Sequence, residues 1–310
     1  MVIFLSVVLG VGLLYAILLL TVSVISVRPP RVPVLLSPAQ FGLPQEPVSL
    51  LTEDGVGLKG WWIQGPGPDV VVCVHGYLSN RCELAPYAVQ LRQLGASVLL
   101  IDLRCHGSSD RAKVTYGLDE AEDVLAALRY AKTRSPMGKI TVFASSMGAV
   151  AALRATLAEG HLVDGLILDG AYGRLDEAAK GFWEIGGFKS VAKLLAPTSM
   201  FGRAVLKVDP RKVVTRPLFA ALDDVPMLLL YGTKDTVVPI ESAKDCVEAA
   251  GVNAKTVWFE GCGHSAGRYS QPELYFDSIA DFLRDNGLVV EPGITQRTQN
   301  PAIKAAGTTV

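Results

Sequence analysis

Two adjacent serines, Ser145 and Ser146, lie where a strand-like run turns into an alanine-rich helix, in the stretch FASSMGAV. A serine on such a sharp corner is raised above the edge of a sheet, provided that the residues two before and two after it are small. Ala144 and Gly148 meet that requirement for Ser146. A serine at this place can also simply cap the helix. The corner predicts Ser146 as a nucleophile, and that interpretation requires a base and an acid elsewhere in the chain.

A serine hydroxyl needs a neighbouring base because it is a weak nucleophile at its own pKa. The chain has four histidines. His75 and His106 each follow an apolar run, and His161 lies in a polar stretch. His264 lies in the glycine-rich stretch EGCGHSAG, after the last apolar run and before the last helix-like segment. Such a loop falls at the carboxyl edge of an α/β sheet, where ligands bind, so His264 is the predicted base.

The base needs a carboxylate to orient it, and the reaction needs donors for the negative oxygen that forms on the substrate. Asp235 follows a strand-like run, and the order Ser, Asp, His along the chain favours it as the acid. Asp169, at the end of another apolar run, is the alternative acid. The backbone amides of Met147, at the start of a helix, and Tyr77, after a His-Gly pair, are the predicted oxyanion donors.

The elements that must position these residues are visible as alternating patterns. Continuously apolar runs are typical of parallel strands that helices cover on both faces, and they occupy 69–76, 97–104, 139–146, 163–170, 226–233 and 255–261. Helix-length segments lie at 83–95, 118–134, 147–159, 241–250 and 272–286. Before them, two apolar runs flank a Glu-Asp-Gly turn, which indicates a hairpin. The predicted fold class is α/β, with a mostly parallel sheet flanked by helices.

The first residues do not look globular. Residues 2–27 carry no charge, and about 20 apolar residues suffice for a helix to span a bilayer. A cleaved signal peptide would have basic residues before the run and a small-residue cleavage site after it. Instead, Arg28 and Arg31 follow the run. The sequence predicts a retained transmembrane anchor over 1–27, single-pass, with the catalytic domain in the cytoplasm.

Four further segments complete the predicted organisation. The proline-rich stretch 28–46 indicates a linker, and 47–286 a single catalytic domain. Inside that domain, about 172–224 is too long for a simple connection and has scattered apolar residues, which favours a helical cap insertion. The polar stretch 287–310, with proline and glycine, is predicted to be a flexible tail.

Composition narrows the partners. The 310 residues have a formal net charge of −1 and no dense Lys/Arg cluster, so a nucleic-acid partner is not expected. The five cysteines are scattered and contain no CxxC pair, which does not suit a disulfide framework. Cys262 and His264 form at most half of a metal site. We expect no metal and no cofactor, and the oligomeric state is left open.

These motifs together resemble the α/β-hydrolase superfamily, and in detail its membrane-anchored serine hydrolases. The matching stretches, in chain order, are TEDGVGLKGWW, VHGY, DLRCHGSSD, ASSMG, GTKDTVVP and GCGHS. The resemblance extends over 47–286, about three quarters of the chain. It implies the α/β-hydrolase fold and makes His106 a structural loop residue. Cys105 stands where the family's loop usually has glycine.

The predicted function is that of a membrane-tethered serine hydrolase that cleaves a carboxylic ester or thioester through an acyl-enzyme on Ser146. The anchor and the apolar cap favour a small-molecule or lipid-like acyl substrate. An aminopeptidase or amidase is the first alternative, because the same triad cleaves amides. A non-catalytic membrane-anchored module is the second, and it predicts the loss of a triad residue. Ser146, Asp235 and His264 are all present.

Overall fold

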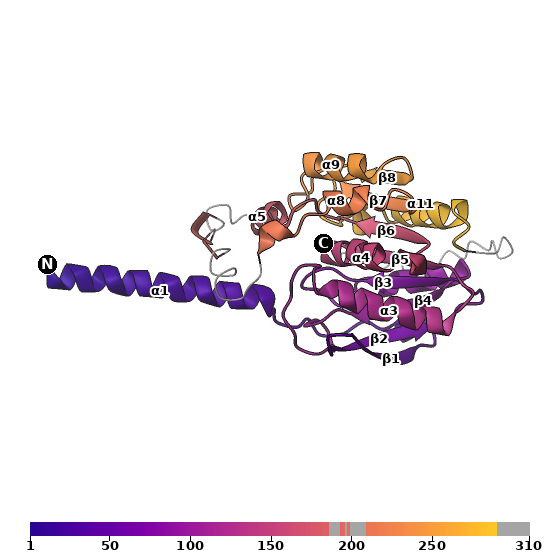
Figure 1. Ribbon diagram of the computed structural model, residues 1–310, viewed down its shortest axis with the longest axis horizontal. Helices are drawn as coiled ribbons and strands as arrows, with labels where there is room; N and C mark the ends of the chain where they lie inside the picture. The colour runs from indigo at the N-terminus through magenta and orange to yellow at the C-terminus, as the bar shows by residue number, and fades with distance from the viewer. Residues whose placement is uncertain (186–192, 196, 199–208, 290–310) are drawn as a thin grey trace.

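The computed structural model describes residues 1–185, 193–195, 197–198 and 209–289. A long apolar helix, α1 (Val2–Val27), projects from an α/β domain, and its amino-terminal end extends away from that domain (Figure 1). The helix is long and apolar enough to cross a membrane, a property that signal sequences share. Its side chains are mostly exposed, as an all-apolar helix without a protein partner must be.

The domain is built on one eight-stranded sheet with the order β1-β2-β4-β3-β5-β6-β7-β8. Its strands are β1 (Glu46–Leu51), β2 (Gly57–Ile63), β3 (Val70–Val74), β4 (Ser97–Asp102), β5 (Ile140–Ser145), β6 (Gly165–Asp169), β7 (Met227–Gly232) and β8 (Ala254–Phe259). The pairs β1–β2 and β2–β4 are antiparallel, and the other pairs are parallel. The predicted α/β-hydrolase fold, with a hairpin start and a mostly parallel sheet, is confirmed.

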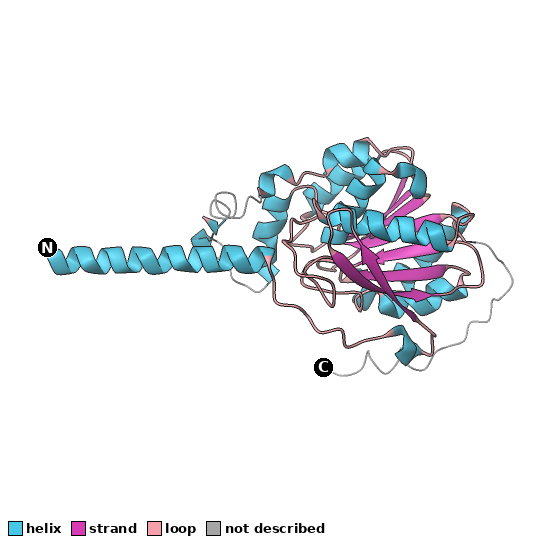
Figure 2. Ribbon diagram, turned by 60° about the horizontal axis from the view of Figure 1, so that its bottom comes forward, coloured by secondary structure: helices cyan, strands magenta, loops and turns pink. Residues whose placement is uncertain are grey.

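Helices cover both faces of the sheet, which explains the continuously apolar strands (Figure 2). Val72 and Val142 point into one core, and Val71 and Phe143 point into the other. The first core lies under α3 (Glu120–Arg134), α4 (Met147–Ala158), α8 (Arg216–Ala220) and α9 (Ile240–Ala250). The second lies under α2 (Ala88–Gln93) and α11 (Pro272–Asp285).

Two predicted segments differ from the structure. The helix expected over 83–95 is a short 3₁₀ turn, η2 (Ala85–Tyr87), followed by α2. Pro86 lies in that turn and has no N–H to donate, so the regular helix begins only after it. The stretch predicted as a linker lies against the domain, a contact that the sequence did not indicate: Asn80 Nδ2 donates to the carbonyl of Val32, 3.0 Å away. A 3₁₀ turn, η1 (Pro38–Phe41), interrupts it.

The predicted cap lies partly outside the described residues. Its described parts are α5 (Leu175–Ile185), η5 (Pro210–Lys212) and α8, in agreement with the expected helical character. The predicted tail lies outside the described residues from 290 onward. The remaining elements are η3 (Gly160–Leu162) and α10 (Gly267–Ser270).

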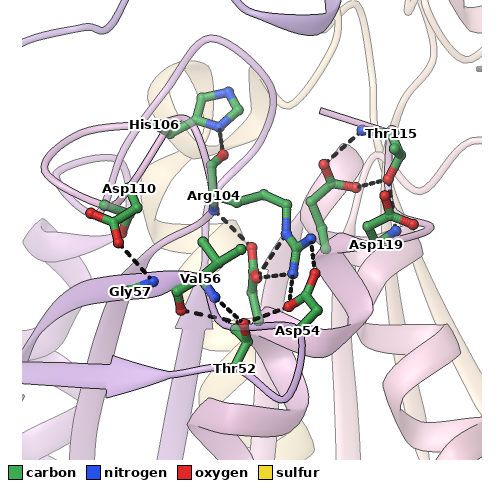
Figure 3. A network of polar contacts seen from close by, with 12 residues as sticks. Thr52, Asp54, Val56, Gly57, Arg104, His106, Asp110, Thr115 and Asp119 are labelled. Atoms are coloured by element: carbon green, nitrogen blue, oxygen red, sulfur yellow. Dashed lines mark hydrogen bonds and ion pairs between the residues drawn. The ribbon is translucent and has the colours of Figure 1, made fainter. Parts of the chain in front are cut away.

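A buried arginine fastens the hairpin to the helical layer (Figure 3). Arg104 donates to Asp123 on α3 through Nε and Nη2, at 2.9 and 2.8 Å, and through its backbone N–H at 2.7 Å. It also donates to Asp54 in the hairpin turn at 2.7 and 3.1 Å. We call these three residues the Arg104 cluster. Their paired charges join the β1–β2 turn, the end of β4 and α3.

Candidate active site

The corner between β5 and α4 holds Ser146 in a strained backbone conformation, with φ 49° and ψ −112°. Its amide N–H donates to the carbonyl of Asp169 at 2.7 Å, which fixes the corner to the end of β6. Gly148 makes the turn feasible, because a Cβ there would lie 2.5 Å from the carbonyl oxygen of His75. Such strain persists only where the surroundings enforce it, and it recurs at functional sites.

The three residues predicted to act together lie in hydrogen-bonding contact. His264 Nδ1 is 2.8 Å from Asp235 Oδ2, and His264 Nε2 is 2.9 Å from Ser146 Oγ. A carboxylate can only accept, so Nδ1 carries the proton and donates to Asp235. In the neutral imidazole, Nε2 is then the acceptor for the Ser146 hydroxyl. The arrangement gives the serine a base, His264, whose orientation is fixed by its hydrogen bond to Asp235.

Both carboxylate oxygens of Asp235 accept hydrogen bonds, as suits an ionised carboxylate. Its Oδ1 accepts the amides of Val237 and Val238 at 2.8 and 2.9 Å, while Oδ2 accepts from His264. The Asp235 side chain is 1% exposed and that of His264 18%, so the acid is enclosed and the base is reachable from outside. Two amides and an imidazole compensate the buried charge.

The alternative acid, Asp169, is engaged elsewhere. Its Oδ2 accepts from Arg268 Nη2 at 2.5 Å and from Tyr275 Oη at 2.6 Å. The structure therefore places Asp169 behind the corner, where its backbone carbonyl binds Ser146 and its carboxylate binds the α10 and α11 side.

The amide of Tyr77 lies in the loop after β3, between two amides that have acceptors. Gly76 N–H donates to Glu83 Oε2 at 2.9 Å, and Leu78 N–H donates to His106 Nε2 at 3.3 Å. Within the described chain, the amides of Tyr77 and Met147 donate to no protein acceptor. A Cβ on Gly76 would lie 3.4 Å from Ser146 Cβ, so this loop borders the serine. Both amides predicted as oxyanion donors are thus available beside Ser146.

The other histidines have structural partners. His75 Nε2 accepts the Leu103 amide at 3.0 Å, and its Nδ1 lies 2.7 Å from the Gly76 carbonyl. Burial lowers the pKa of His75, and burial together with His75 lowers the pKa of His106 to about 4. Both rings are therefore neutral at pH 7 and hold the loops around Tyr77. His161 lies exposed in η3, away from this constellation.

A second buried arginine lies directly behind the site, and the sequence did not single it out. Arg268 donates to Glu83 Oε1 at 2.6 Å, to Asp169 Oδ2 and to Ser145 Oγ at 2.9 Å. We call Arg268, Glu83 and Asp169 the Arg268 cluster. Burial alone would raise the pKa of Glu83, but Arg268 and the Gly76 amide lower it to about 2. The cluster joins the Tyr77 loop, the serine corner and the helix that follows His264.

One signal for this cluster was present but too weak to use. Arg268 comes four residues after His264, on α10. Glu83 lies at the start of the helix predicted over 83–95, and no sequence motif includes it. Cys105, noted in place of a usual glycine, has a φ of +64°, which lies in the left-handed region that glycine favours.

Comparisons with known proteins give the family of the fold that carries this site. A model of the alpha/beta hydrolase family matches residues 71–278. Rv2307c of Mycobacterium tuberculosis, an uncharacterised protein, is 28% identical over 77% of this chain and 79% of its own. The uncharacterised membrane protein YNL320W of Saccharomyces cerevisiae is 23% identical, over 82% of this chain and 84% of its own.

A solved structure of the esterase Pf2001 from Pyrococcus furiosus superposes with a TM-score of 0.70. Its sequence is 27% identical, and the match covers 84% of this chain and 98% of the esterase. The family model extends over more than half of the chain, across the sheet that carries the serine corner. The chain therefore belongs to the alpha/beta hydrolase family.

Proposed function

We propose that the protein is a serine hydrolase that cleaves carboxylic esters or thioesters, with Ser146, His264 and Asp235 as its catalytic triad. The observation that carries the proposal is the hydrogen-bonded chain from Ser146 Oγ through His264 to Asp235, beside two unpaired amides. The resemblance to an esterase at 27% identity favours esters among the substrates of this fold.

The reaction follows from the geometry. Ser146 Oγ attacks the acyl carbon while its proton passes to His264 Nε2, and Asp235 stabilises the resulting imidazolium. The amides of Tyr77 and Met147 bind the oxyanion. The C–O or C–S bond then breaks, and His264 protonates the leaving alcohol or thiol. Water, deprotonated by His264, releases the acid from Ser146 by the same steps.

We propose further that α1 is a retained membrane span. Its carboxyl end packs into the domain, with Leu19, Ser23 and Val27 buried and the Val27 carbonyl accepting the Val114 amide at 2.8 Å. A leader that is cleaved has no reason to form such contacts. The charges of Arg28, Arg31 and Arg111 gather beside Cys105 at this end, which favours the cytoplasmic side. A reporter fused after Val310 that behaves as translocated would reverse the orientation.

A fluorophosphonate probe tests the catalytic proposal. We expect wild-type protein to be labelled, and Ser146→Ala and His264→Ala to lose labelling. Labelling that persists in Ser146→Ala would reject the nucleophile. A panel of acyl esters, acyl thioesters and aminoacyl amides then compares the esterase with the amidase alternative, and faster cleavage of the amides would replace the ester proposal.

A further inference from the structure

Tyr77 connects the candidate active site to the membrane helix. Its hydroxyl donates to the carbonyl of Ser26 at 2.9 Å, and the hydroxyl of Tyr116 donates to the same oxygen at 2.7 Å. Ser26 is the last residue but one of α1. The Tyr77 amide lies in the loop that borders Ser146. Tyr77 therefore links the loop that borders Ser146 to the carboxyl end of α1.

The length of α1 sets the height of the site above the membrane. The helix has 26 residues, whereas roughly 20 cross the hydrocarbon core. At about 1.5 Å per residue, the excess rises about 9 Å, close to the depth of one headgroup layer. The polar residues Ser23 and Ser26 lie in this excess. Ser26, and with it the Tyr77 loop, is thus at headgroup level when α1 spans the bilayer.

A described segment of the cap follows α1 towards its middle. The carbonyl of Thr198 accepts from Ser23 Oγ at 3.1 Å, and the carbonyl of Leu194 accepts from Tyr15 Oη at 2.6 Å. Tyr15 lies eight residues before Ser23, about 12 Å deeper along the helix. The Leu194 side chain is nevertheless 51% exposed. At that depth its surroundings are acyl chains rather than water.

A second apolar side chain lies between the site and the membrane. Phe182 on α5 contacts the Tyr77 ring edge-on, with the ring centroids 6.2 Å apart, and it is 42% exposed. Figure 1 shows α5 beside the carboxyl end of α1. Exposed apolar side chains therefore lie both beside the Tyr77 ring and on the cap segment along α1.

We infer that the substrates are long-chain acyl esters of lipids resident in the bilayer that α1 spans, which reach Ser146 laterally past the cap segment at Leu194. This inference rests on the proposed hydrolase function. A lipid ester lies at the boundary between hydrocarbon and headgroups, so it has to rise only about the thickness of the headgroup layer. Its chains stay in apolar surroundings throughout, which avoids the large cost of transferring them through water.

The test uses the full chain in vesicles of ether-linked phosphatidylcholine, which has no ester of its own, doped with dioleoylglycerol. Release of oleate and hydrolysis of soluble p-nitrophenyl acetate are measured on the same preparation. Leu194→Glu introduces a charge at acyl-chain depth and is compared with Leu157→Glu. Leu157 is 49% exposed and lies near the end of α4 remote from Ser146, so it is a matched control.

We expect Leu194→Glu to lower oleate release about tenfold or more, because a charge in the hydrocarbon is costly. Its hydrolysis of p-nitrophenyl acetate should stay within about twofold of wild type, and Leu157→Glu should change neither rate. Dioleoylglycerol in separate, protein-free vesicles should be cleaved far more slowly than in the protein's own vesicles.

Three outcomes would overturn the inference. Cleavage of p-nitrophenyl acetate without release of oleate would reject membrane lipids and leave the hydrolase function standing. Equal effects of the two glutamate variants on oleate release would reject the route past Leu194. Absence of both activities, together with absence of fluorophosphonate labelling, would reject the hydrolase function and the inference with it.

Discussion

The Arg104 cluster and the Arg268 cluster have the same chemistry in two different places. Each is a buried guanidinium between two carboxylates, one of which is also almost fully buried. The first opens to solvent through Asp54, whose side chain is 45% exposed, and joins the hairpin to α3. The second is closed and joins the loops that present Tyr77, Ser146 and His264. The comparison separates what stabilises the fold from what aligns the site.

Replacing each arginine by leucine should give the largest difference between the two clusters: similar losses of stability, but very different losses of kcat. Both variants leave buried carboxylates uncompensated, so each should lose about 3–5 kcal/mol of unfolding free energy. Arg268→Leu also frees the Gly76 loop and the Ser145 corner, and misplacement by about 1 Å can cost roughly 100-fold in rate. At a temperature where both variants are folded, we expect kcat to fall roughly 100-fold in Arg268→Leu. The kcat of Arg104→Leu should stay within about threefold of wild type.

The measurements are thermal unfolding in detergent and steady-state kinetics with p-nitrophenyl acetate. An equal loss of kcat in the two variants would mean that general loosening of the fold, rather than alignment by Arg268, sets the rate.

Replacing one acidic partner in each cluster should give the same difference in kcat, but a smaller one. Glu83→Gln keeps an acceptor for the Gly76 amide but removes the charge that holds Arg268, so kcat should fall about tenfold with little change in KM. Asp54→Asn alters an exposed partner and should leave kcat unchanged. The rate of fluorophosphonate labelling should follow kcat, because the probe uses the same oxyanion donors. A higher KM at constant kcat in Glu83→Gln would contradict an aligning role.

Acid should also distinguish the clusters. The pKa of Glu83 is held at about 2 in the folded protein, below its ordinary value of 4.5. A lowered folded-state pKa contributes stability above pH 4.5, and that contribution is lost as the pH falls towards 2. Glu83→Gln has no carboxylate here, so its stability does not decrease in this way. In wild type the decrease amounts to about 3 kcal/mol of unfolding free energy, given a pKa lowered from 4.5 to about 2. The unfolding temperature of wild type should therefore approach that of Glu83→Gln as the pH falls from 4.5 to 2.

Arg104 also lowers the pKa of Asp54, but that carboxylate is far more exposed. The difference in unfolding temperature between wild type and Asp54→Asn should therefore change less with acid than the difference between wild type and Glu83→Gln, and in the same direction. If both differences change equally steeply between pH 4.5 and 2, the distinction between the clusters is removed.

The fold could be predicted because its strands and helices leave patterns in short, continuous stretches of the sequence. Strands buried on both faces are continuously apolar, so β3 to β7 are visible in the sequence with small errors at their ends. The three residues proposed as the triad each follow a strand at the carboxyl edge, and that edge brings them together whatever separates them in the chain. The geometry of Ser146, His264 and Asp235 agrees with that expectation.

The parts that the sequence did not reveal depend on long-range pairing. Glu83 and Arg268 are 185 residues apart and share no periodicity or motif. The contact between Tyr77 and Ser26 likewise joins residues far apart in the chain, and no sequence motif connects them.

The late start of α2, by contrast, is a local feature that the sequence could have predicted, because Pro86 disfavours a helix interior.

Ser145→Ala should give the smallest effect and the sharpest separation of the two adjacent serines. Ser145 Oγ accepts from Arg268 at 2.9 Å and is buried, so its loss leaves one donor of a charged group unsatisfied. We expect about 1–3 kcal/mol of destabilisation and a decrease of only a few fold in kcat. Fluorophosphonate labelling should persist, because the proposed nucleophile is Ser146. Loss of labelling in Ser145→Ala at full stability would place the reactive hydroxyl one residue earlier, on the wrong side of the corner to reach His264.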